Sequence, residues 1–193
     1  ITKDALNEHF IVFEGPDDSL MAIWTQSDMA GGLPGGRQKN RIKFSRSDDQ
    51  GNTWAEPTHV VGPVSGEDES CYMTSWAFPM VTDKGRIYVV YSQHMGKIGW
   101  CAMHTGIMCG VYSDDNGQTW SESDEIPFKR NQYDDPTGDT PPEWIVWQRP
   151  LKDLQGNFLA PYSRWVHKSV ATLPPEVIKE HNASWTWWES VCE

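Results

Sequence analysis

One eight-residue pattern occurs twice in the chain, at residues 47–54 and 113–120, and both copies read S-D-D-x-G-x-T-W. Each copy follows a short strand-like run, residues 41–46 in the first case and 110–112 in the second. An Asp side chain accepts hydrogen bonds from the backbone of its own turn, and Gly adopts positive φ without a Cβ clash. The pattern therefore predicts a hairpin corner at each copy, with Trp54 and Trp120 as buried apolar anchors.

The two copies begin 66 residues apart, and the similarity extends beyond the motif. The turn at residues 15–20 matches residues 83–87, and Trp24-Thr25-Gln26 matches Tyr91-Ser92-Gln93. This spacing suits one four-stranded blade of a β-propeller with loop insertions. We therefore expect one blade at about residues 1–61 and a second at about 62–127.

Residues 128–193 begin a third unit without an Asp-containing corner. Strands are expected at residues 144–149, 158–163 and 185–190, with one short helical turn at 174–181. The unit also carries a long insertion relative to the other two. We expect a single, partial all-β domain of about three blades, which is a fragment of a longer protein or associates with further blades.

The repeated pattern resembles the Asp-box of the sialidase (neuraminidase) superfamily of β-propellers. The resemblance implies a sialidase-type propeller with six or seven four-stranded blades in the parent protein, and the remaining blades as structural partners. In that superfamily the Asp-box lies on the blade periphery, so its residues are expected to be structural. They are Ser47, Asp49, Gly51, Thr53 and Trp54 in the first copy, and Ser113, Asp115, Gly117, Thr119 and Trp120 in the second.

The net charge is −11, with 27 acidic and 16 basic residues, and this balance argues against nucleic acid or an anionic membrane as a partner. No stretch of the sequence has the apolar length needed to cross a bilayer. The four cysteines have no C-x-x-C spacing, so we predict buried free thiols, no metal site and no cofactor. They are Cys71, Cys101, Cys109 and Cys192.

Propeller active sites lie at the axial face, so the informative positions follow Trp24, Tyr91 and Tyr162. The first position leads into a glycine-rich loop at residues 29–36. The other two carry the residue types of acid–base and anion-binding chemistry. The predicted catalytic residues are His94, Tyr91 and Tyr162, and the predicted substrate-binding residues are Arg149, Arg164, Gln93, His104 and Trp165.

The resemblance implies a carbohydrate-active enzyme, a glycoside hydrolase that cleaves acidic glycans outside the cell or in the periplasm. Sialidases carry a Phe-Arg-Ile-Pro segment near the start, whereas residues 9–13 here contain no arginine, and Asp28 is the only carboxylate near the place of the sialidase loop acid. That departure argues against sialic acid itself as the substrate. Arg149 and Arg164 are then the residues expected to bind the carboxylate of the substrate.

Residues 78–94 also resemble sialidase-related propellers that act on uronic-acid polysaccharides, by hydrolysis or by β-elimination. In a lyase of this kind, His or Tyr removes the proton α to the carboxylate, and Arg neutralises that carboxylate. A polysaccharide lyase is therefore one alternative to the hydrolase. A non-catalytic carbohydrate-binding propeller is the other, because it would keep the Asp-boxes and the aromatic residues.

Overall fold

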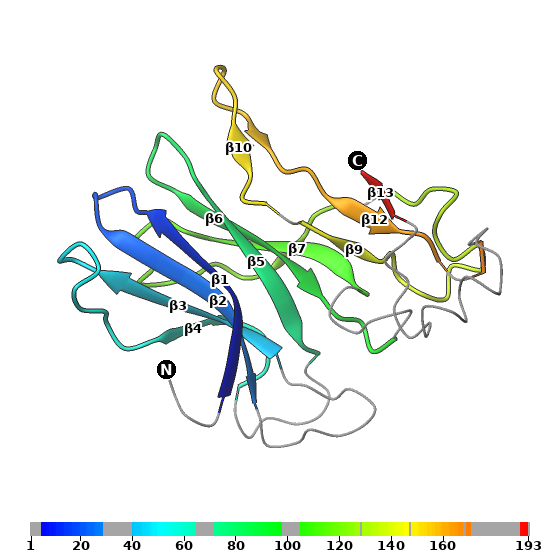
Figure 1. The fold of residues 1–193 in the computed structure, drawn as a ribbon, viewed down its shortest axis with the longest axis horizontal. Coiled ribbons are helices and arrows are strands. Elements are labelled where there is room, and N and C mark those ends of the chain that lie inside the picture. The colour runs from blue at the N-terminus through cyan, green and yellow to red at the C-terminus, as the bar shows by residue number, and fades with distance from the viewer. Residues whose placement is uncertain are drawn as a thin grey trace, which may run out of the picture.

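The computed structural model describes residues 5–28, 40–64, 72–97, 105–127, 129–146, 148–167, 169–170 and 190–192. All the regular secondary structure in these segments is β-strand, arranged in antiparallel sheets. This confirms the predicted all-β class, and the arrangement is consistent with a β-propeller-like fold (Figure 1). Within these segments no helix is long and apolar enough to cross a membrane.

The first two sheets have the same plan, four antiparallel strands in the order of the sequence. In each sheet the first and second strands join through a tight turn, and the third and fourth join through an Asp-box. The first sheet contains β1 (Ala5–Glu14), β2 (Leu20–Asp28), β3 (Asn40–Ser47) and β4 (Thr58–Val61). The second contains β5 (Thr74–Val81), β6 (Ile87–Gln93), β7 (Ile107–Ser113) and β8 (Asp124–Glu125).

The third region begins the same plan with shorter strands. Its sheet has the order β13-β12-β9, from β9 (Trp144–Ile145), β12 (Ser163–Trp165) and β13 (Ser190–Cys192). A separate hairpin pairs β10 (Leu151–Lys152) with β11 (Phe158–Leu159). An ion pair between Lys152 and Asp83 holds this hairpin to the β5–β6 turn. The expected helical turn at 174–181 lies outside the described residues.

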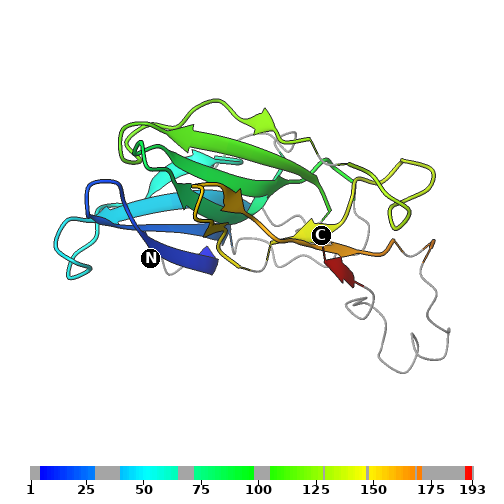
Figure 2. The same cartoon turned by 90° about the horizontal axis from the view of Figure 1, so that it is seen from above.

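The main core lies between the first and second sheets, which pack face to face (Figure 2). Alternate residues of each strand point into this layer, as the two-residue period of a strand requires. The first sheet contributes Phe13, Met21, Ile23, Ile42 and Phe44, and the second contributes Ala77, Ile87, Val89, Tyr91, Cys109 and Val111. A smaller cluster of Phe78, Trp144 and Val146 joins the second sheet to the third.

Both Asp-boxes form hairpin corners, as predicted, and their hydrogen bonds are nearly identical. In the first, Ser47 Oγ accepts the Gly51 N–H at 2.8 Å, and Asp49 Oδ1 accepts the Thr53 N–H at 2.8 Å. In the second, the matching distances are 2.9 Å at Gly117 and 2.8 Å at Thr119. The hydroxyls of Thr53 and Thr119 also donate to Asp49 Oδ2 at 2.6 Å and to Asp115 Oδ2 at 2.5 Å. These hydroxyl bonds, followed by those from the threonine N–H groups, stabilise the ionised carboxylates and lower the pKa of Asp49 and of Asp115 to about 2.

The expected burial of the two motif tryptophans is wrong for Trp54. Its side chain is 40% exposed, whereas Trp120 is half-buried and packs edge-on against Phe44, with ring centroids 5.5 Å apart. The two turns are alike, so the difference in exposure comes from packing. Among the described residues, only the second corner lies against another sheet. Of the predicted free thiols, Cys109 is buried and unpaired. Cys71 and Cys101 lie outside the described residues, and for Cys192 only the backbone, in β13, is described.

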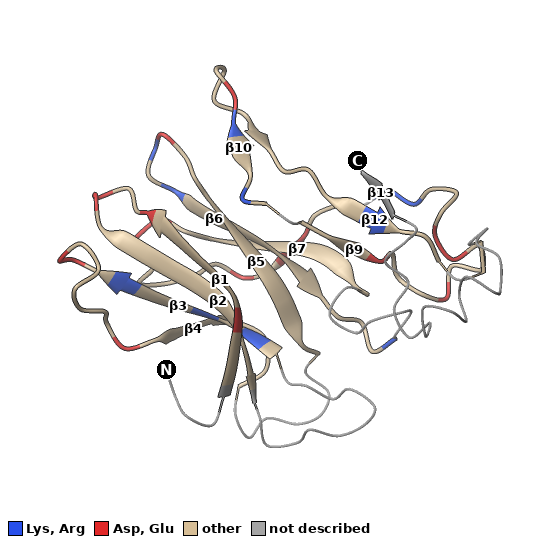
Figure 3. Cartoon of the chain, viewed as in Figure 1, with Lys and Arg blue, Asp and Glu red and all other residues tan. Residues whose placement is uncertain are grey.

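The tight turns and the Asp-boxes lie at one end of the sheets, which we call the corner end (Figure 1). It consists of residues 15–19, 47–54, 82–86 and 113–120. Charged residues occur in these turns, as the colours of the ribbon in Figure 3 show. At the opposite end, β2 and β6 finish and β3 and β7 begin, and we call this the loop end.

Candidate functional site

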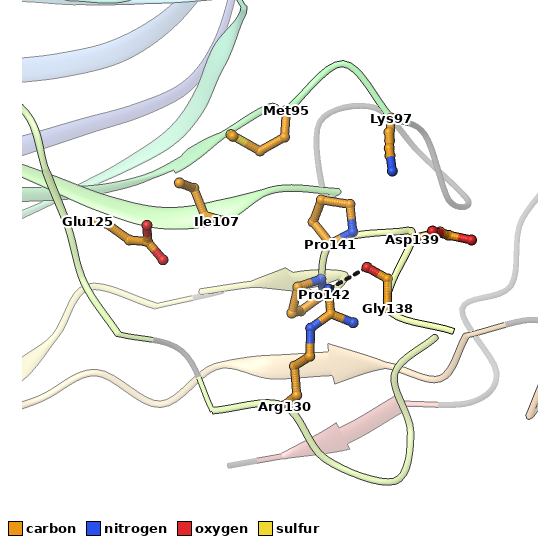
Figure 4. Close-up of a pocket in the computed structure, with 9 residues that line it drawn as sticks. All are labelled: Met95, Lys97, Ile107, Glu125, Arg130, Gly138, Asp139, Pro141 and Pro142. Atoms are coloured by element: carbon orange, nitrogen blue, oxygen red, sulfur yellow. Dashed lines mark hydrogen bonds between the residues drawn. The ribbon is translucent and has the colours of Figure 1, made fainter. Parts of the chain in front are cut away.

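A pocket of about 430 Å³ opens at the loop end of the second sheet. Its walls come from the end of β6, the start of β7, the end of β8 and the segment that leads to β9, as Figure 4 shows. The lining residues are Met95, Lys97, Ile107, Glu125, Arg130, Gly138, Asp139, Pro141 and Pro142. The volume lies in the range of small-molecule sites.

Arg130 is held in place by backbone carbonyls. Its guanidinium donates hydrogen bonds to the carbonyl oxygens of Asp135 at 3.5 Å, Gly138 at 3.3 Å and Thr140 at 3.0 Å. These bonds are made to neutral acceptors, and within the described segments no carboxylate forms an ion pair with Arg130. Together with Lys97, Arg130 gives the pocket two cations of the kind that bind carboxylates and phosphates.

Two carboxylates, Glu125 and Asp139, line the same pocket, and both are exposed. In the view of Figure 4 they lie on opposite sides of the pocket, with Ile107 and the two prolines between them. Carboxylates can act as general acid, base or nucleophile towards a bound sugar. The pocket therefore combines anion-binding groups with groups that can transfer protons.

His94 lies next to the pocket residue Met95, at the end of β6. Its ring contacts Tyr72 edge-on, with centroids 6.0 Å apart, and its Nδ1 accepts the Gly96 N–H at 3.2 Å. Burial lowers the pKa of His94, with a smaller opposing effect from the backbone at Lys97. A neutral ring whose Nδ1 accepts a hydrogen bond carries its proton on Nε2. Nε2 is buried and has no hydrogen-bond partner among the described residues, so its N–H is not exposed to a ligand in this structure.

Arg164 is buried and forms an ion pair inside the fold. Its guanidinium is 1% exposed, and it donates to Asp134 Oδ2 at 3.0 Å and to the Lys129 carbonyl oxygen at 2.8 Å. A buried ion pair of this kind is costly to disrupt. The pair fixes the start of the segment that contains Arg130, so Arg164 supports the pocket from behind and does not line it.

The other predicted site residues are dispersed. Tyr91 is fully buried in the main core, and its hydroxyl shares a 2.6 Å hydrogen bond with Ser123 Oγ. Burial raises the pKa of Tyr91 to about 12, which keeps the phenol protonated. Tyr162 packs against the smaller hydrophobic cluster, and Trp165 is buried on β12.

The remaining predicted site residues do not line the pocket either. Gln93 Nε2 donates to the carbonyls of Tyr72, Met73 and His94 at 3.2–3.4 Å. Arg149 lies over the Phe13 ring, 5.8 Å from its centroid, and Phe13 is at the corner end of β1. His104 and the loop at residues 29–36 lie outside the described residues.

Sequence reasoning missed the four charged residues of the pocket. A signal was present for two of them, because Arg130 and Asp139 lie in the insertion that has no counterpart in the first two repeats. Insertions in repeat proteins map to loops, often on the binding face. Lys97 follows His94 closely in the same loop. In the part of the chain that the structure describes, no group of three His, Cys, Asp or Glu is placed to hold a metal ion.

Comparisons with known proteins give a family match and a similar solved structure. The profile of the BNR repeat-like domain matches residues 18–191. Among solved structures, a protein of unknown function from Dyadobacter fermentans DSM 18053 is similar, with 18% sequence identity and a TM-score of 0.49. That match covers 83% of this chain and 34% of the other, so the chain spans about a third of that protein.

No match was found among curated proteins. The family match covers most of the chain, including both Asp-boxes and the pocket segment. The two corners carry the hydrogen bonds of the repeat, at equivalent places in two equivalent sheets. The chain belongs to the BNR repeat-like domain family, the Asp-box family related to sialidases.

Proposed function

We propose that this chain is part of a sialidase-like, carbohydrate-active protein that binds an acidic glycan at the loop end and cleaves a glycosidic linkage there. In this proposal its three sheets are blades of a larger propeller. The observation that carries the proposal is the pocket, in which Lys97 and Arg130 face the same 430 Å³ space as Glu125 and Asp139. The family relationship supports glycan chemistry at a coarser level.

The cations argue for an acidic sugar. The chain has a net charge of −11, so its overall field repels anions. Two cations facing one pocket reverse that tendency locally. Lys97 and the preoriented Arg130 would bind the carboxylate of a uronate or a sialate, and Met95 and Ile107 would pack against the sugar ring.

Hydrolysis would use the two carboxylates. A glycoside hydrolase needs one carboxyl group to protonate the leaving oxygen and a second to act as base or nucleophile. Glu125 and Asp139 come from separate segments, the end of β8 and the insertion, so a sugar between them could be approached from both sides. We assign them these two roles.

A lyase is the second candidate function. It depends on whether His94 can act as the base, and so on which of its ring nitrogens carries the proton. Elimination needs a base for the proton α to the carboxylate. His94 is neutral, but its Nε2 carries the proton because Nδ1 accepts from Gly96. In this geometry neither ring nitrogen of His94 is placed to abstract a proton, because Nδ1 accepts from Gly96 and Nε2 is buried and protonated. The geometry therefore favours hydrolysis over elimination by His94.

The test is a substrate screen with product-specific detection. The protein is incubated with sialyl-lactose and with glucuronate-containing polysaccharides, followed by assays for free sialic acid, reducing ends and the ultraviolet absorbance of an unsaturated uronate. Reducing ends without the ultraviolet signal support the hydrolase. An ultraviolet signal that is lost in His94→Ala supports the lyase instead, and binding without any product supports the non-catalytic alternative.

Variants connect the activity to the pocket. We expect Lys97→Ala to raise KM about tenfold or more through loss of a charge-assisted contact, with an unchanged unfolding temperature. Lys84→Ala is the matched control, because Lys84 is an exposed lysine at the corner end. Equal effects of the two lysine variants would contradict the assignment of the pocket.

A further inference from the structure

Tyr72 lies at the loop end, two residues before β5 begins, and it is 45% exposed. Hydrogen bonds fix the backbone around it to the end of β6. Gln93 Nε2 donates to the Tyr72 carbonyl oxygen at 3.3 Å and to the Met73 carbonyl oxygen at 3.4 Å. The His94 N–H also donates to the Met73 carbonyl oxygen, at 3.0 Å. Tyr72 is therefore open to solvent on a backbone that is held in place.

The Tyr72 ring lies beside the pocket. A Cβ added to Gly96 would lie 2.8 Å from Tyr72 Cε1 and 2.9 Å from the Tyr72 hydroxyl oxygen, so the ring lies directly over the backbone of Gly96. Met95 and Lys97, which flank Gly96 in the chain, both line the pocket (Figure 4). The ring thus stands against the wall of the pocket that carries Lys97, and it lies outside the pocket itself.

Two contacts hold the ring in this position. It meets the His94 ring edge-on, with centroids 6.0 Å apart, and it packs on Gly96. The backbone of Gly96 has φ 76°, which favours glycine, and any larger residue there would displace the ring. A side chain that is already oriented loses little further freedom when a ligand packs on it.

The exposed surface has the chemistry of a sugar-stacking site. Tyrosine offers a flat apolar ring and a polar hydroxyl at its tip. A pyranose has the matching features, a face of C–H groups and a rim of hydroxyls. Met95 is 40% exposed and lines the pocket, so it adds apolar surface next to the ring. A single sugar inside the pocket would leave Tyr72 uncovered, whereas the next sugar of a chain would lie over it.

We infer that Tyr72 forms a second subsite, which binds the sugar next to the one held by Lys97 and Arg130. The glycan is then recognised as a chain of at least two sugars. The pocket selects an acidic sugar through its cations, and the uncharged ring of Tyr72 adds affinity for the neighbouring sugar. Gln93 is a positioning residue in this arrangement, because it fixes the Tyr72 backbone. This inference rests on the proposed function and extends it from one sugar to a chain.

Isothermal titration with methyl glucuronide and with tetraglucuronate, a linear tetrasaccharide of the same sugar, tests the subsite. We expect Tyr72→Ala to weaken binding of tetraglucuronate about three- to tenfold and to leave binding of methyl glucuronide unchanged, because only the longer ligand extends beyond the pocket. Tyr72→Phe keeps the ring and should retain most of the affinity. Tyr88→Ala is the matched control, since Tyr88 is an exposed tyrosine near the corner end of β6.

The outcomes separate this inference from the proposed function. Equal losses for the two ligands in Tyr72→Ala would show that Tyr72 only shapes the pocket, and no loss for either would show that it contacts no sugar. Both results overturn the subsite while leaving the acidic-sugar pocket intact. If Tyr72→Ala fails to fold, Tyr72→Leu is measured instead, with the same expectation, because leucine fills space without an aromatic face. Absence of binding of both ligands by the wild type contradicts both proposals.

Discussion

The two Asp-box corners have the same sequence pattern and the same internal hydrogen bonds, but they have different neighbours. In the second corner, a Cβ added to Gly117 would lie 2.3 Å from Phe44 Cζ, and Asn116 Nδ2 donates to Asp17 Oδ2 at 3.0 Å. In the first corner, a Cβ added to Gly51 would lie 3.5 Å from Leu20 Cδ1, which is ordinary contact.

This difference separates what the motif determines from what packing determines. The turn is local, since every bond that closes it joins residues within the motif. Burial is not local, because Phe44 of the first sheet covers the second corner and no described residue covers Trp54 in the same way. The motif specifies a corner, and the adjacent sheet specifies how much that corner contributes to stability.

The largest difference between the corners is expected for glycine replacement. Gly51 and Gly117 both have positive φ, 90° and 82°, so either substitution by Ala costs about 1–2 kcal/mol of backbone strain. Gly117→Ala also collides with the Phe44 ring, which adds about 1–3 kcal/mol. Urea denaturation measures both variants, and Phe44→Leu combined with Gly117→Ala should relieve the collision. Equal destabilisation by the two single variants would contradict the packing account.

A smaller difference is expected for the motif tryptophans. Replacing a fully buried Trp by Ala costs about 3–5 kcal/mol, so the half-buried Trp120 should lose about 2–3 kcal/mol. Trp54→Ala should lose under about 1 kcal/mol, because the side chain is already 40% exposed. Thermal unfolding of the two variants provides the comparison. A loss at Trp54 that matches Trp120 would show that the first corner is covered in solution.

No difference is expected for the motif serines. Ser47 and Ser113 are both buried, and each accepts the N–H of its motif glycine. Ser47→Ala and Ser113→Ala should each lower the free energy of unfolding by about 1–3 kcal/mol, by leaving that N–H unpaired. Urea denaturation with unchanged slopes would check that the unfolded states are comparable. A clear inequality would mean that the two turn networks are not equivalent.

The pH dependence of the corners should also be equal, and it is the smallest effect. The pKa of Asp49 and of Asp115 is lowered to about 2, so both turns are stabilised above the unfolded pKa near 4. That stability is lost as the pH falls through about 2. Unfolding temperatures from pH 5 to pH 2 should fall less steeply in Asp49→Asn and in Asp115→Asn than in the wild type. If only one of the two variants changed the slope of unfolding temperature against pH, the two corners would not be equivalent.

The parts of the fold that could be predicted from the sequence are those formed by residues close together in the chain. The corners were predictable because Ser, Asp, Gly and Thr bond within one turn. Strand positions followed from alternation, with ends displaced by a few residues. The exposure of Trp54 was not predictable, because burial depends on a residue from another sheet. Its counterpart Trp120 is covered by Phe44, which lies 76 residues earlier in the chain.

The candidate site was less predictable than the fold. Residue type selected Tyr91 and Arg164, but the alternation of β6 points Tyr91 into the core, and Asp134 binds Arg164 inside the fold. The pocket depends on how an insertion folds back over β7 and β8, which no repeat copy predicts. The place of Tyr72 beside the pocket was hidden as well, because its ring meets His94 and Gly96 only once β5 pairs with β6.

The central claim is that the corner end stabilises the sheets and the loop end recognises the glycan. The most direct test measures the unfolding temperature and the affinity for tetraglucuronate in Asp115→Ala and Lys97→Ala, side by side. We predict that Asp115→Ala lowers the unfolding temperature and leaves affinity unchanged, whereas Lys97→Ala lowers affinity about tenfold or more at an unchanged unfolding temperature. Loss of affinity in a folded Asp115→Ala variant, with full affinity in Lys97→Ala, would contradict the claim.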